Sequence, residues 1–271
     1  MAASSSTDER SIDLAGGRVS WREAGEGAPL VLLHGVGSNA GSWERQLSAF
    51  PGYRVLAWNA PGYGPSSPLQ PDAPDAGDYA QRLAEWLDAL GVSRINLVGH
   101  SLGCLVAARF AADFPQRVGS LTLASIAAGH ARMAPEDRKR LLEGRVGDVA
   151  ELGPRGMAEK RGPRLLGPKA TSEQIRAVVE AMASVDPQGY AQAARMLSGG
   201  DIIADLARLP DSVPLQIVFG SADLITTPEA NRRVAAHVLR AKVIEIPDAG
   251  HALSVDAAEA FNAAIAAHLR P

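Results

Sequence analysis

The chain has 271 residues, of which 46% are hydrophobic and 21% are charged, and its formal net charge is -3. This composition predicts one large folded core and argues against the basic surface that nucleic-acid binding requires. The sequence contains neither an apolar run long enough to span a bilayer nor the basic and apolar regions of a signal peptide. The single cysteine, Cys104, cannot form an internal disulfide, which fits a reducing compartment. From charge, hydropathy and cysteine content together, we expect a cytoplasmic protein that binds neither nucleic acid nor membrane.

Short β-type runs alternate with helix-type segments along most of the chain. This alternation is typical of a mostly parallel sheet with helices on both faces, an α/β fold. The expected strands are residues 30–33, 53–58, 95–98, 121–124, 215–219 and 243–246. An earlier run, 18–23, follows the turn signal Gly16-Gly17 and predicts the second strand of an N-terminal hairpin, at an antiparallel edge of the sheet.

Helical periodicity is clearest in two segments. Residues 78–90 place apolar side chains on one face, and Gly91 provides the stop signal. That face would contain Tyr79, Leu83, Trp86, Leu87 and Leu90. A last helix is expected after Asp256, its predicted N-terminal cap, with Phe261, Ile265 and Leu269 spaced four residues apart toward the sheet.

Residues 129–200 interrupt the alternation of strands and helices. This stretch has no β-type run, is rich in Arg, Gly, Pro and helix-forming residues, and carries an excess of positive charge. We therefore expect a helical cap, or lid, inserted after the sixth strand, with residues 1–128 and 201–271 forming the core.

A candidate nucleophile follows the strand predicted at residues 95–98. The sequence Gly99-His100-Ser101-Leu102-Gly103 matches G-x-S-x-G and precedes a helix-compatible segment, which is the strand-turn-helix context that this motif requires. A serine on such a tight turn needs glycine two residues away on either side, because larger side chains would collide with neighbouring backbone. The pattern predicts Ser101 as nucleophile and the Leu102 N–H, at the start of the helix, as an oxyanion-hole donor.

A second oxyanion donor should come from the loop after the strand at 30–33. That loop begins His34-Gly35-Val36-Gly37, and the Val36 N–H is the candidate. A dinucleotide-binding glycine loop is the competing interpretation. It is disfavoured because the glycine spacing is one residue too long and the next strand is followed by Asn59 where an acidic residue is needed.

Activation of a serine hydroxyl requires a base with a pKa near neutrality, which points to histidine. His251 lies in the loop after the last strand, where its side chain can reach the carboxyl edge of the sheet. Asp223, in the loop after the strand at 215–219, is the predicted carboxylate that orients it, with Asp248 as the alternative. The other histidines are less suitable as the base, because we expect them at structural or surface positions or turned away from the serine. They are His34, His100, His130, His237 and His268.

The sequence offers no metal-ligand motif such as H-x-x-x-H or C-x-x-C, so we expect neither a metal nor another cofactor. Cys104 is best explained as a buried packing residue. Trp43 and Arg45 lie just past the oxyanion loop, and together with the positive cap they predict contacts to a small carboxylate-bearing substrate.

These segments resemble the α/β-hydrolase superfamily over almost the whole chain. The resemblance is carried, in the family's order, by LVLLHGVG, NAPGYGPS, NLVGHSLG, FGSADLITTP and IPDAGHAL. The compact cap and WNAPGYGPSSPL are most similar to 3-oxoadipate enol-lactonases and meta-cleavage-product hydrolases. The resemblance implies Ser101, Asp223 and His251 as the catalytic triad, with the N–H groups of Val36 and Leu102 as the oxyanion hole.

The sequence also departs from these relatives. Many of them carry Ser-Met-Gly-Gly where this chain has Ser101-Leu102-Gly103-Cys104, an aspartate at Asn59, and, among carbon-carbon bond hydrolases, a tryptophan at Ala252. Families with an aspartate nucleophile, the haloalkane dehalogenases and epoxide hydrolases, are disfavoured by Ser101.

The expected activity is that of a serine hydrolase cleaving a small-molecule carboxylic ester or lactone through an acyl-enzyme, for example an enol-lactone. Three alternatives stay open: a carbon-carbon bond hydrolase of ring-fission products, an acyl transferase or perhydrolase with the same triad, and a non-catalytic small-molecule receptor on the same fold.

Overall fold

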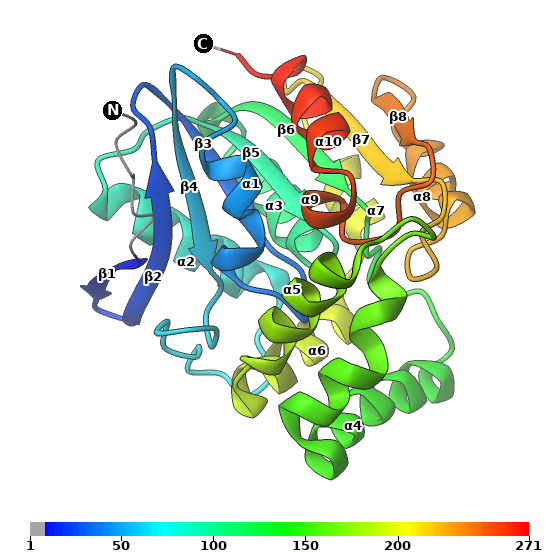
Figure 1. Cartoon of the computed structure of the whole chain (residues 1–271). Helices are drawn as coiled ribbons and strands as arrows, with labels where there is room; N and C mark the ends of the chain where they lie inside the picture. Colours follow the sequence, from blue (N-terminus) through cyan, green and yellow to red (C-terminus); the bar gives the residue numbers. More distant parts are fainter. Residues whose placement is uncertain (1–8, 271) are drawn as a thin grey trace, which may run out of the picture.

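A computed structural model describes residues 9–270 and contains one eight-stranded sheet in the order β1-β2-β4-β3-β5-β6-β7-β8. The strands are β1 (Glu9–Leu14), β2 (Gly17–Ala24), β3 (Ala28–Leu33), β4 (Tyr53–Asn59), β5 (Ile95–His100), β6 (Val118–Ala124), β7 (Leu215–Gly220) and β8 (Lys242–Ile246). The predicted hairpin is present as β1 and β2, which pair antiparallel, and β2 also runs antiparallel to β4. The remaining neighbours pair parallel, which confirms the expected sheet (Figure 1).

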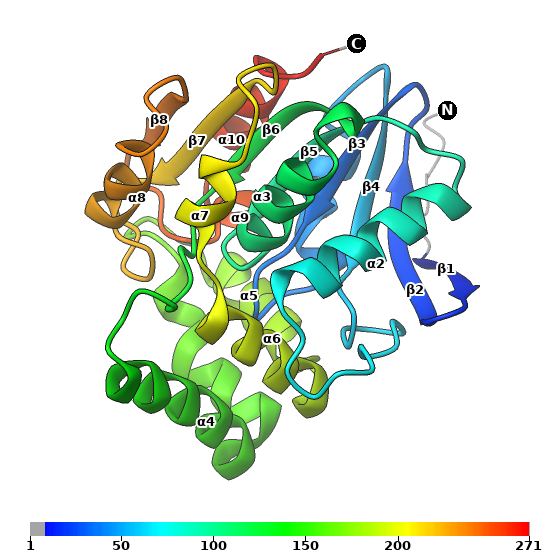
Figure 2. The same cartoon turned by 180° about the vertical axis from the view of Figure 1, so that it is seen from behind.

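The central strands are continuous apolar runs because both of their faces are covered. Every residue of β5, β6 and β7 is buried. On one face lie α1 (Glu44–Leu47), α9 (Leu253–Asp256) and α10 (Ala258–Ala266), and on the other lie α2 (Ala76–Ala89), α3 (Gly103–Asp113), α7 (Ile202–Ala207) and α8 (Pro228–Ala235), as Figures 1 and 2 show. The short 3-10 turns are η1 (Ala40–Trp43), η2 (Pro115–Arg117) and η3 (Gly162–Leu165).

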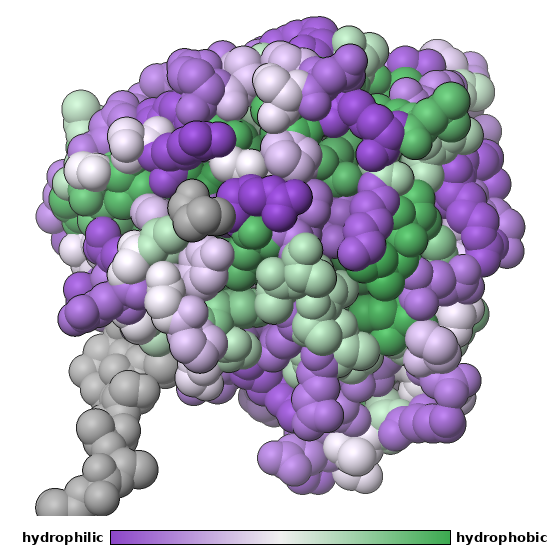
Figure 3. Space-filling model, turned by 90° about the horizontal axis from the view of Figure 1, so that it is seen from above, coloured by the Kyte–Doolittle hydropathy of each residue, from purple (hydrophilic) through white to green (hydrophobic). Residues whose placement is uncertain are grey.

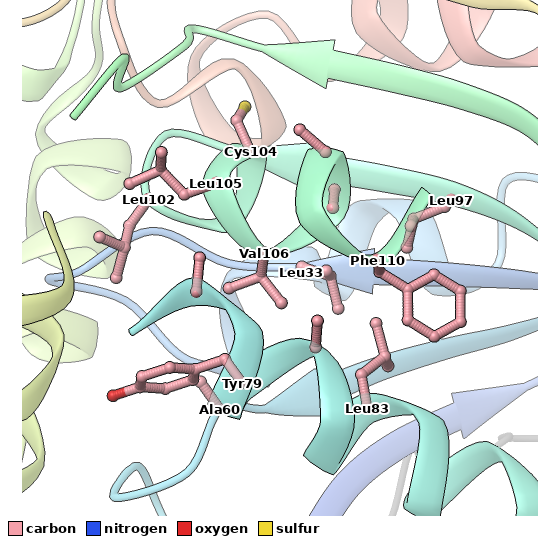
Figure 4. Close-up of a cluster of buried hydrophobic side chains, with 14 of the residues drawn as sticks. Leu33, Ala60, Tyr79, Leu83, Leu97, Leu102, Cys104, Leu105, Val106 and Phe110 are labelled. Atoms are coloured by element: carbon pink, nitrogen blue, oxygen red, sulfur yellow. The ribbon is translucent and has the colours of Figure 1, made fainter. Parts of the chain in front are cut away.

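Helix α2 packs against α3, which begins two residues after Ser101. Helix α2 begins at an Asp75 capping box with Asp78, two residues earlier than the periodicity predicted. Its Tyr79 and Leu83 lie toward α3, where Figure 4 shows Val106 and Phe110. This apolar contact fixes the helix that begins immediately after Ser101.

Between β6 and β7 the regular structure is entirely helical, with α4 (Pro135–Arg161), η3, α5 (Ser172–Ala183) and α6 (Pro187–Gly199). Helix α4 is broken at Gly153, whose φ is 64°, directly before Pro154. These helices cover the edge of the sheet to which the arrowheads of β4 and β7 point (Figure 1). The domain boundaries at 129 and 200 stay a prediction, and residues 1–8 of the predicted core lie outside the described residues.

The structure corrects the expected role of Asp256. This residue is the last of α9, and α10 begins after Ala257 without a side-chain cap. The Asp256 carboxylate instead accepts the N–H of Gly167, from the cap, at 2.8 Å and the N–H of Gly250, beside His251. Its position is therefore set by a contact between distant segments and not by local helix geometry.

The face opposite the cap is covered mainly by hydrophilic side chains, with apolar atoms visible between them (Figure 3). Across residues 9–270, no helix combines the length and the apolar character that crossing a membrane would require.

Candidate active site

Ser101 lies on a strained turn between β5 and α3. Its φ is 55°, in the left-handed region that costs a residue with a side chain about 1 kcal/mol or more. A Cβ on Gly99 would lie 2.5 Å from the carbonyl oxygen of Gly103, and a Cβ on Gly103 would overlap the carbonyl of Leu33. Both glycines of the motif are therefore required by close backbone approach. The Ser101 N–H donates to the carbonyl of Ala124 at 2.9 Å, which ties the turn to β6.

The loop after β3 is held beside this turn by a buried histidine. His34 Nδ1 donates to the Gly35 carbonyl (2.8 Å), and its Nε2 accepts the N–H of Ala60 (3.0 Å), which defines the tautomer. Because the peptide is planar and trans, fixing the Gly35 carbonyl also fixes the opposed N–H of Val36. The Tyr63 hydroxyl donates to the Val36 carbonyl at 2.7 Å and holds the next peptide.

His251 and Asp223 form a hydrogen-bonded pair, with 2.9 Å between His251 Nδ1 and Asp223 Oδ2. Both residues are buried. Burial opposes ionisation of Asp223, but hydrogen bonds from His251 and from the backbone N–H groups of Ile225 and Thr226 outweigh it and lower its pKa to about 2. The carboxylate is thus ionised near neutral pH, and it holds the Nδ1 proton so that Nε2 can accept one.

Sequence reasoning missed two side chains that contact this pair. The Thr226 hydroxyl donates to Asp223 Oδ2 at 2.8 Å and lies 3.2 Å from His251 Nδ1. His100, predicted to turn away from the serine, packs its ring 4.9 Å from that of His251 and bonds the His251 carbonyl through Nε2 at 2.7 Å. The position of Thr226, three residues after Asp223, could have indicated the first contact from the sequence. No local sequence feature indicated that the His100 ring would contact His251.

The predicted site residues lie around one cavity of about 940 Å³. Ser101, His251, Val36 and Leu102 all line it, and Asp223 lies behind the imidazole. The cap provides the opposite wall through residues of α4, α5 and α6. The five residues named from the sequence therefore lie in or directly behind one cavity, and their catalytic roles are proposals developed below.

The two predicted substrate contacts differ in outcome. Arg45 lies on the cavity wall, exposed, with its guanidinium 4.0 Å from Glu259, and its role stays a prediction. Trp43 does not line the cavity; it is 1% exposed and stacks on Phe261 of α10, so its predicted substrate contact is wrong. The last turn of η1 directs the indole into the core, where its large apolar area is better buried.

Neither Asp248, the alternative acid, nor Cys104 lines the cavity. Asp248 is exposed and pairs with Lys169 at 2.6 Å. Cys104 is fully buried, and its thiol donates to the carbonyls of Gly99 (3.1 Å) and Ala124 (3.3 Å), while burial raises its pKa far above the usual range. In the described part of the chain, no three His, Cys, Asp or Glu side chains are grouped so that they could hold a metal ion.

Residues 28–258 match the family described as the alpha/beta hydrolase fold, and the chain belongs to this family. It is similar to the (E)-2-((N-methylformamido)methylene)succinate hydrolase of Acinetobacter baylyi, with 28% identity over 254 residues, 91% of this chain and 92% of that protein.

Among solved structures, the chain resembles a thermophilic esterase from Thermogutta terrifontis, described as malate bound (TM-score 0.84, 26% identity, 95% of this chain and 96% of that one). It also shares the fold of the enol-lactonase from Burkholderia xenovorans LB400 (TM-score 0.84, 23% identity, 94% and 98%).

A methyl group at Gly99 should destabilise the protein. We expect Gly99→Ala to lower the free energy of unfolding in urea by about 1–3 kcal/mol, because the backbone must move to admit the new atom. Gly144→Ala is the matched control: it lies on α4 with no atom near its Cβ position, and should be neutral or stabilising by up to about 1 kcal/mol. Equal stability of the two variants would contradict the steric explanation.

Acid should destabilise the fold through two buried histidines. Burial lowers the pKa of His34 to about 4; burial and then the charge of His251 lower that of His100 to about 3. Below the unfolded pKa of about 6.5, the unfolded chain binds protons that the folded chain does not. The free energy of unfolding should therefore fall between pH 6.5 and 4, by about 1.4 kcal/mol per pH unit for each histidine.

Urea titrations at a series of pH values measure this slope. His34→Asn should reduce this slope by about one proton relative to wild type. A slope that is the same in His34→Asn and wild type would show that His34 is not the group responsible.

Proposed function

We propose that this protein is a serine hydrolase that cleaves a carboxylic ester or lactone through an acyl-enzyme formed on Ser101. The observation that carries the proposal is the hydrogen bond of 2.9 Å between His251 and an ionised Asp223, with Ser101 and His251 lining one cavity. Membership of the alpha/beta hydrolase family and likeness to proteins named as hydrolases and an esterase support it.

The chemistry follows from the proton positions. Asp223 accepts the Nδ1 proton of His251, so Nε2 is available to take the proton of the Ser101 hydroxyl as the oxygen attacks the carbonyl carbon. The Val36 and Leu102 N–H groups stabilise the oxyanion of the tetrahedral intermediate. His251 then protonates the leaving alcohol, and a water deprotonated by the same histidine attacks the acyl-enzyme, releasing the acid and regenerating Ser101.

A carbon-carbon bond hydrolase, an acyl transferase or perhydrolase, and a receptor without turnover are the other candidates for the same site. The carbon-carbon bond hydrolase would differ from the proposed ester hydrolase in its substrate. The acyl transferase and the perhydrolase would form the same acyl-enzyme but pass the acyl group to another acceptor. Product analysis with ring-fission substrates, added alcohol or peroxide separates them. A receptor would release no product from any ester.

Removal of the nucleophile tests the proposal directly. Wild type should release p-nitrophenol from p-nitrophenyl acetate, and Ser101→Ala should lose about 10⁴-fold or more in kcat, because it cannot form the acyl-enzyme. Cys104→Ala is the control: its thiol is buried on the adjoining helix, so this variant should retain activity. Turnover that survives Ser101→Ala would exclude the proposed mechanism.

The oxyanion loop should be sensitive to His34. His34→Ala removes the bond that fixes the Gly35 carbonyl and, with it, the Val36 N–H, so kcat should fall by about 10²-fold with little change in KM. His34→Asn keeps a donor at the Nδ1 position and should recover part of the loss. Equal rates in both variants, with folding verified by urea titration, would mean that this histidine does not position the donor.

A further inference from the structure

Several charged side chains line the cavity, and most of them are paired. Arg22 bonds Glu44 at 3.1 Å, and Glu180 bonds Arg155 at 2.6 Å. Arg161 pairs with Asp148 across the break in α4. These groups are neutralised by partners within the protein and offer little net charge to a ligand.

Arg145, on the first segment of α4, is different. It lines the cavity and is half-buried, yet no acceptor or carboxylate among residues 9–270 pairs with its guanidinium. Arg164 also lines the cavity without a partner, but it is exposed and therefore hydrated by bulk solvent. A cation partly removed from water without a counter-charge is unfavourable, and an anion brought by a ligand would offset that cost.

The positive charge of Arg145 acts on two groups, one of which lines the cavity and the other of which contacts the loop after β3. Burial and then the positive charge of Arg145 lower the pKa of His130, which also lines the cavity. His130 is thus neutral near pH 7 and does not compete for an anion. The same charge acts on Tyr63, which bonds the carbonyl of Val36.

We propose that Arg145 is a specificity-determining residue that binds a carboxylate of the substrate, so that the preferred ester or lactone carries an anionic group. A planar guanidinium can bind both oxygens of a carboxylate, which fixes orientation as well as charge. This inference rests on the proposed function, and it assigns the cap a defined chemical task.

Paired esters test the assignment. Mono-p-nitrophenyl adipate carries a free carboxylate, and its methyl ester is the neutral counterpart with the same acyl chain. Arg145→Met should lower kcat/KM for the anionic ester by about 10- to 100-fold, mainly through KM, and leave the neutral ester within about threefold. Arg145→Lys, which keeps the charge without the two-pronged geometry, should give an intermediate loss. Arg164→Met, at the exposed cavity arginine, should not change the preference.

A binding measurement separates this inference from the proposed function. Adipate itself should raise the Tm of wild type and of Arg164→Met, and should not raise that of Arg145→Met. If wild type hydrolyses neither ester while this Arg145-dependent shift persists, the hydrolase proposal fails and the anion site stands. Equal losses on both esters in Arg145→Met, or an adipate shift that survives in this variant, would overturn the role of Arg145.

Discussion

Close contact between backbone segments is the constraint on which the site depends. The turn at Ser101 fits only because Gly99 and Gly103 have no side chains, and Gly103 packs directly on the end of β3. The loop after β3 is also close to this turn, since a Cβ on Gly35 would lie 3.0 Å from that of Ser101. The strain of a positive φ at Ser101 is offset by packing of the helix that follows it, and Ser101 lines the cavity at the start of that helix.

Buried polar side chains around this contact hold donors and acceptors in fixed protonation states. His34 stays neutral and fixes the peptide between Gly35 and Val36, while Asp223 stays ionised and fixes the imidazole of His251. Burial acts in opposite senses on the two: it favours the neutral histidine and would disfavour the carboxylate, which needs several donors to remain charged. Thr226 supplies two of those donors, through its backbone N–H and its hydroxyl.

Much of the architecture could be predicted because its signals are local. The order of strands and helices follows from periodicity, and Ser101 follows from glycine spacing on a strand-turn-helix segment. Trp43 could not be placed from sequence, since its burial depends on Phe261, from a helix far along the chain. Asp256 was assigned a local cap, although its partners are backbone groups of two other loops. The sequence did not single out Arg145 as a ligand contact. It differs from the other arginines of the cavity because it is half-buried without a partner among residues 9–270, and only the folded cap shows this.

The cap has one surface that contacts the loop carrying His251 and another that faces only the cavity. Gly167 and Gly250 meet backbone to backbone with no room for a Cβ on either, and the Ala252 N–H donates to the Leu165 carbonyl at 2.8 Å. Changes at these residues would displace His251 along with the cap. Residues of α4 and α6 that face the cavity are not part of this contact. Natural or engineered substitutions there can therefore change the substrate range without displacing His251.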